Sequence, residues 1–144
     1  MTCTFFGHKN APNKIEPSLR SALVDLIQNK NVDLFYIGSQ GNFDYMAKTI
    51  LKSLKIDYPH INYFIVLAYL PTQKNKYNGC SHSDTIYPEL LENIPPRYAI
   101  SKRNMWMIDR SDYVITYVKN NFGNSAHFKR IAENRGKNIL NIDI

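Results

Sequence analysis

A carboxylate and two glycines follow an apolar run in the stretch GSQGNFD, residues 38–44. Asp44 could cap a following helix, bind ribose hydroxyls or act on the carbon of a glycosidic bond, and the sequence leaves these roles open. Gly38, Ser39 and Gly41 permit a turn that brings backbone N–H groups close to a phosphate. Their spacing matches neither the dinucleotide fingerprint nor a Walker A loop. The stretch therefore predicts a ligand loop of another kind.

Two other polar loops also follow apolar runs. Gly7 ends the run TCTFFG and is followed by His8 and Lys9, and there a simple turn and an anion site are equally good interpretations. A second loop precedes a helical pattern whose amino terminus could hold an anion. The residues of this second loop are Gly123, Asn124 and Ser125.

Arg103 and Asn104 are candidate ligand-binding residues on a predicted helix over residues 96–110. Neighbouring residues on a helix point about 100° apart. We therefore expect one of the two to reach the ligand and the other to cap a nearby loop. Trp106, on the same helix, is predicted to lie in the core or at a subunit contact, with stacking on a base as the weaker alternative.

The composition limits the classes of partner. Lys and Arg number 18 against 12 Asp and Glu, a formal charge of +6, but the basic residues are scattered. That charge suits a small anionic ligand at least as well as nucleic acid. The two cysteines have no Cys-x-x-Cys spacing, and CSHSD (residues 80–84) is weak as a metal site, so we expect no bound metal.

The elements that must position these residues alternate between strand and helix patterns. Strands are predicted at 2–7, 33–38, 61–70, 113–118 and 137–142, and helices at 15–31, 43–55, 96–110 and within 120–136. This order predicts one domain over residues 1–144: a Rossmann-like three-layer α/β/α sandwich with a mostly parallel sheet of five or slightly more strands. Gln73–Asp84 is predicted to be a loop. Ligands of such folds bind at the carboxyl edge of the sheet.

The apolar stretches are too short for a membrane-spanning helix, since the longest, Tyr63–Leu70, falls far below the ~20 residues required. The first twelve residues have no basic region followed by a long apolar one, so they do not predict a secretion signal. We therefore expect a cytoplasmic protein without membrane contacts. The apolar cluster Met105–Met107 makes a homodimer an open alternative.

The segments CTFFGHK, FYIGSQGNFD, PPRYAISKRNMWMIDRSDYVI and FGNSAH…GKNILNI together resemble the SLOG superfamily, the Rossmann-like group that contains the LOG phosphoribohydrolases and the DNA-processing protein DprA. The likeness is greatest to small, stand-alone bacterial members. It assigns residues 38–44 to the family's first glycine-rich loop and residues 123–125 to its second phosphate-binding loop. It also matches Gly7, His8, Arg103 and Asn104 to recurring polar positions.

The resemblance implies binding of a nucleotide or NAD-derived ligand at the carboxyl edge. We expect no further cofactor, and a sensor is one role that such a binding protein could have. LOG enzymes carry a catalytic glutamate in a Pro-Gly-Gly-x-Gly-Thr-x-x-Glu loop, whereas this chain has NNFGNSAHFKR there. If the protein is an enzyme, Asp44 is therefore the expected catalytic carboxylate, cleaving or transferring at an N-glycosidic bond. The kinship with DprA and the net charge add a DNA-associated module as a third alternative.

Overall fold

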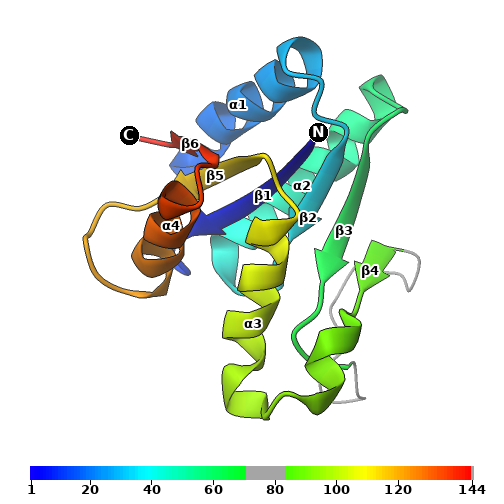
Figure 1. The fold of residues 1–144 in the computed structure, drawn as a ribbon. Helices are drawn as coiled ribbons and strands as arrows, with labels where there is room; N and C mark the ends of the chain where they lie inside the picture. The colour runs from blue at the N-terminus through cyan, green and yellow to red at the C-terminus, as the bar shows by residue number, and fades with distance from the viewer. Residues whose placement is uncertain (71–83, 144) are drawn as a thin grey trace.

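The computed structural model describes residues 1–70 and 84–143, which form a six-stranded parallel sheet covered by helices on both faces (Figure 1). The strand order is β4-β3-β2-β1-β5-β6. The strands are β1 (Thr2–Gly7), β2 (Leu34–Ile37), β3 (Asn62–Val66), β4 (Thr85–Ile86), β5 (Tyr113–Tyr117) and β6 (Asn138–Asn141). The predicted α/β class and Rossmann-like architecture are confirmed.

Four α-helices and two short 3-10 helices connect the described strands. They are η1 (Asn13–Ile15), α1 (Glu16–Asn29), α2 (Gly41–Asp57), η3 (Glu89–Asn93), α3 (Pro96–Asp109) and α4 (Asn124–Asn134). The buried residues of α1 and α2 belong to the larger core on one face of the sheet. Those of α3 and α4 contribute to a second core on the other face. In these described parts of the chain, no helix combines the length and apolar character needed to cross a membrane.

The central strand β1 contributes to both cores because its side chains alternate between the two faces. Phe5 points into the larger core and stacks on Phe35, with ring centroids 6.3 Å apart. Phe6 points into the second core and stacks on Phe128 at 5.6 Å. Burial on both faces explains why Phe5 and Phe6 can stand next to each other in β1.

The third strand is shorter than predicted. β3 ends at Val66, and residues 67–70 lie outside it, with Leu70 60% exposed. The prediction of a strand over 61–70 was wrong at this end, because an apolar run does not by itself mark where a strand stops. The two-residue strand β4, which pairs with β3, had not been predicted. Residues 73–83 of the expected Gln73–Asp84 loop lie outside the described residues.

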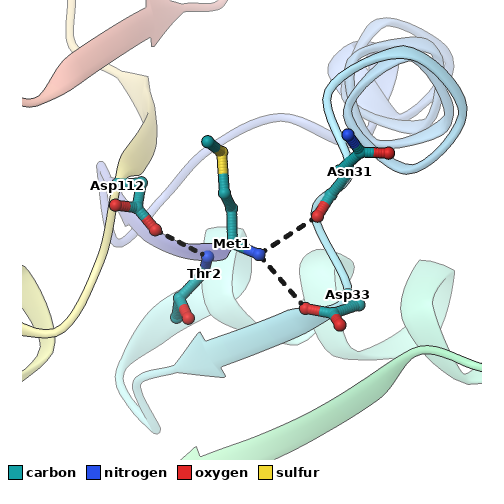
Figure 2. Close-up of polar contacts among 5 residues, drawn as sticks. All are labelled: Met1, Thr2, Asn31, Asp33 and Asp112. Atoms are coloured by element: carbon teal, nitrogen blue, oxygen red, sulfur yellow. Dashed lines mark hydrogen bonds and ion pairs between the residues drawn. The ribbon is translucent and has the colours of Figure 1, made fainter.

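Polar contacts fix the amino end of β1, as Figure 2 shows. The Met1 ammonium donates to the Asn31 carbonyl at 3.1 Å and to Asp33 Oδ1 at 3.3 Å. The Thr2 N–H donates to Asp112 Oδ2 at 3.0 Å. These bonds tie β1 to the segments that precede β2 and β5. The central strand is therefore anchored at the edge opposite its carboxyl end.

Candidate functional site

A cavity of about 350 Å³ opens at the carboxyl end of β1. Because β1 has β2 on one side and β5 on the other, this is the point where the order of strands reverses. Ligands of open α/β sheets bind at such a position. The cavity is lined by Phe5, Phe6, Gly7, His8, Lys9, Gly38, Gln40, Asp44, Ile100, Arg103, Asn104, Met107, Asn124, Ser125 and Phe128.

Asp44 lies in the first turn of α2, and its carboxylate turns back toward the preceding loop. Its Oδ2 accepts a hydrogen bond from the Gln40 N–H at 3.0 Å. The pKa of Asp44 is raised to about 6 by burial, against the opposing effects of the Arg103 charge and the Gln40 bond. Capping of α2, one of the roles that the sequence left open for Asp44, is therefore present. The same carboxyl group also faces the cavity.

Arg103 is held in a fixed orientation within α3, with only 2% of the residue exposed. Its Nη1 donates to the Val66 carbonyl at 2.9 Å and lies 3.5 Å from Ser39 Oγ. Its Nε donates to Asn104 Oδ1 at 2.8 Å, which orients that amide. Both residues line the cavity, although only one of the two had been expected to reach the ligand. The bond between the two side chains brings them together despite their adjacent positions on the helix.

Gly38 provides the space in which the carboxylate and the guanidinium lie. A Cβ at this position would be 2.8 Å from Asp44 Oδ2 and 3.5 Å from Arg103 Cζ. Any side chain here would displace the Asp44 carboxylate. The glycine after β2 is thus required by the site itself.

The loop after β1 packs on the first residues of α2. The Lys9 carbonyl accepts a hydrogen bond from the Asn42 N–H at 2.8 Å. Gly41 has φ +90°, and a Cβ there would be 2.7 Å from Lys9 Cα. His8 is held from the other side, because its Nε2 accepts the Lys119 N–H at 2.8 Å. These contacts fix the imidazole of His8 and the backbone at Lys9 beside the cavity.

The amino terminus of α4 lies at the opposite wall of the cavity. Ser125 Oγ donates to the Gly7 carbonyl at 2.7 Å and so joins α4 to the end of β1. Gly123 is the N-cap residue, with φ +95°. The first turn of α4, which the structure describes in full, contains no acidic residue, whereas α2 has Asp44 in its first turn. The partial positive charge at the start of α4 is thus not balanced by a carboxylate in that turn.

Nine of the twelve predicted site residues line the cavity: Gly7, His8, Lys9, Gly38, Asp44, Arg103, Asn104, Asn124 and Ser125. Ser39, Gly41 and Gly123 are not among the residues that line it. Ser39 contacts Arg103, Gly41 packs on Lys9, and Gly123 is the N-cap residue of α4. The apolar wall had not been predicted, since such residues resemble ordinary core. Ile100 and Met107 could have been found from their helical spacing around Arg103.

The apolar cluster on α3 is largely used inside the fold. Met107 is 1% exposed, belongs to the second core and lines the cavity. Trp106 packs edge to face on Tyr36 at 5.0 Å and lies under the Arg110 guanidinium at 4.2 Å. Trp106 is not among the described residues that line the cavity, and it packs against the second core, in line with the main prediction of a core position. The cluster also offers little surface for the predicted pairing of two copies.

The cysteines and the candidate metal ligands can be located in part. The described ranges 1–70 and 84–143 contain no group of three or more His, Cys, Asp or Glu residues that could hold a metal ion. Cys3 is buried in the larger core, and burial raises the pKa of its thiol. Cys80 and His82, which had been weighed as a weak metal site, lie outside these ranges.

No protein-family model matches the sequence, and no curated protein matches it. The chemistry of the cavity is therefore the basis for assigning a function.

Proposed function

We propose that the protein binds a small nucleotide or NAD-derived ligand in the cavity at the carboxyl end of β1. One observation carries this proposal: Asp44, Arg103 and the start of α4 converge on a single cavity where the strand order reverses. A ligand with hydroxyl groups and a phosphate would find a partner for each of them there. The resemblance to the SLOG superfamily points to the same class of ligand.

The phosphate belongs at the start of α4. A helix amino terminus attracts anions through its free N–H groups and its dipole. At α2 the Asp44 carboxylate already accepts the Gln40 N–H, so a phosphate there would meet a like charge whenever Asp44 is ionised. At α4 Asn124 and Ser125 face the cavity with no carboxylate beside them in that turn, and Lys9 lines the same cavity.

The sugar belongs near Asp44 and Arg103. Asp44 can accept hydrogen bonds from ribose hydroxyls, and the Asn104 amide can donate to them. The Arg103 guanidinium is fixed by its bonds to Val66 and Asn104, so it presents a preorganised positive charge. The apolar wall, which includes Phe5, Ile100 and Met107, would exclude water from the remainder of the ligand.

The second candidate function is cleavage or transfer at an N-glycosidic bond, and the raised pKa of Asp44 favours it. A carboxyl group with a pKa of about 6 exchanges its proton near neutral pH. As a carboxylate, Asp44 could attack the ribosyl carbon while the bond from that carbon to the base breaks, and water or another acceptor would then displace Asp44. It could instead stabilise the positive charge that develops on that carbon as the base leaves.

The test is thermal unfolding with AMP, ADP, ATP, NAD, ADP-ribose and a short DNA duplex, followed by chromatography of the incubated nucleotides. A nucleotide at 100 times its Kd should add about 2.7 kcal/mol of stability, which is several degrees for a chain of this size. The Asp44→Asn variant should reduce that shift, whereas Asp57→Asn, at the exposed far end of α2, should not.

Each outcome separates the candidates. Intact nucleotide after long incubation, with a stabilisation that depends on Asp44, supports a binding protein. Release of the base, lost in Asp44→Asn while binding remains, supports the enzyme. No stabilisation by any nucleotide would overturn both functions, and a salt-sensitive response to DNA alone would support the third expectation, a DNA-associated module.

A further inference from the structure

The strand β6 is an exposed edge of the sheet. Among the described residues its only strand neighbour is β5. Asn138, Leu140 and Asn141 are exposed, and Leu140 retains 38% of its surface. The segment from residue 137 to 143 contains no proline or glycine. Such an edge can accept another strand.

The hydrogen bonds to β5 show which backbone groups of β6 point outward. The Asn138 N–H donates to the Asp112 carbonyl at 3.1 Å, and the Ile142 N–H donates to the Thr116 carbonyl at 2.7 Å. In a parallel pair, the N–H and C=O groups of alternate residues bond to the same neighbour. The backbone groups of Ile139 and Asn141, which have the other parity, therefore point away from the sheet.

We propose that a second copy of the chain pairs with β6 in the antiparallel direction, around a two-fold axis at Leu140. In this register Ile139 lies opposite the partner's Asn141, and the same pair recurs on the other side of the axis. Each pair joins residues whose backbone groups point outward, so each can exchange two hydrogen bonds. Leu140 lies opposite the partner's Leu140 as a non-hydrogen-bonded pair, in which side chains approach most closely.

Charge complementarity identifies the occupant as a second copy. Lys137 precedes the strand and Asp143 follows it, each three residues from Leu140. The antiparallel register places Lys137 opposite the partner's Asp143 on both sides of the axis, whereas a parallel pairing would place like charges together. A lysine at a sheet edge usually opposes pairing, but here it has a matching carboxylate. The segment is thus complementary to itself, as a two-fold interface requires.

The test measures the mass in solution of the full chain and of two charge-reversal variants by sedimentation, at concentrations up to about 1 mM. The unaltered chain should be dimeric. Lys137→Asp and Asp143→Lys should each raise the dimer Kd about tenfold, because like charges then face each other twice. An equimolar mixture of the two variants should form a heterodimer, visible by native mass spectrometry. Lys30→Asp, an exposed reversal at the end of α1, should leave the dimer unchanged.

The mixture distinguishes this register from damage to the fold, since two misfolded variants would not restore each other. A monomeric chain at the highest concentration would overturn the proposal. A dimer that both reversals leave intact would also overturn it and would place the interface on another face. The proposal is independent of the proposed function, because β6 contributes no residue to the cavity.

Discussion

Gly7 lies directly against the ring of Phe43: a Cβ at residue 7 would be 2.3 Å from Phe43 Cγ. Phe43 is buried in the first part of α2, and its ring also stacks on Tyr117 at 6.4 Å. The contact therefore joins the end of β1 to the start of the helix that carries Asp44. The glycine that the sequence offered as either a turn or a ligand loop is required by packing.

Gly7→Ala should lower the free energy of unfolding by about 1–3 kcal/mol, because the added methyl group must displace a buried ring. Urea denaturation measures this loss. Phe43→Leu in the same chain removes the ring, so the double variant should lose less stability than the sum of the single losses. Strict additivity of the two losses would show that the Gly7–Phe43 contact does not matter.

Asp44 should make stability depend on pH in a definite direction. Burial raises the pKa of Asp44 from an ordinary value of 3.8 to about 6 in the fold, so the native state binds the proton more tightly than the unfolded chain does. The free energy of unfolding contributed by Asp44 therefore falls as pH rises from about 4 to about 6, and it is constant above that range. The Asp44→Asn variant has no titrating carboxyl group at this position, so it lacks this dependence of stability on pH.

The stability of Asp44→Asn relative to the unaltered protein should thus increase by up to about 3 kcal/mol between pH 4 and pH 7. Urea denaturation at several pH values measures the difference. The same series is measured with Asp57→Asn, which loses a carboxylate elsewhere on α2. Its change in the free energy of unfolding at each pH is subtracted as the control. A flat difference for Asp44→Asn after that subtraction would contradict the raised pKa.

Much of the site could be predicted from the sequence because parallel strands bring their carboxyl ends together. The alternation of strands and helices along the chain predicts a parallel sheet. The polar residues that follow β1, β2 and β5 are therefore expected at one edge of that sheet. The loops of Gly7, Gly38 and Asn124 meet there. Their convergence follows from topology alone.

The pairing of side chains could not be predicted in the same way. Asn104 lines the cavity and accepts a bond from Arg103, and the positions of two buried side-chain ends cannot be derived from helical angles alone. The end of β3 was missed because Leu67 and Ala68 are apolar and buried although they lie outside the strand. Their burial comes from tertiary packing, which a local pattern does not contain.

The bond from Ser125 to Gly7 should stabilise the junction between α4 and β1. Ser125→Ala removes the donor to the Gly7 carbonyl and should cost about 1 kcal/mol, a fall in Tm of about 3 °C. Ser125→Thr keeps a hydroxyl group and should lose less. Calorimetry of the three proteins measures the effect. An unchanged Tm in Ser125→Ala would mean that water replaces the hydroxyl at no cost.

Arg103 should hold the pKa of Asp44 below the value that burial alone would give it. Its charge opposes the effect of burial, so Arg103→Met should raise the pKa of Asp44 above about 6. The carboxyl carbon shift of Asp44, followed by NMR across a pH titration, measures this directly.

Arg103→Met should also destabilise the fold by about 1–3 kcal/mol, because the Val66 carbonyl and the Asn104 side chain lose a buried donor. Arg103→Lys separates charge from geometry: it keeps a positive charge near Asp44 but cannot supply the same fixed set of donors. The pKa of Asp44 should therefore stay closer to 6 in Arg103→Lys than in Arg103→Met. Equal pKa values of Asp44 in all three proteins would show that the Arg103 charge does not act on Asp44. The proposed role of Arg103 as a preorganised positive charge in the cavity would then be contradicted.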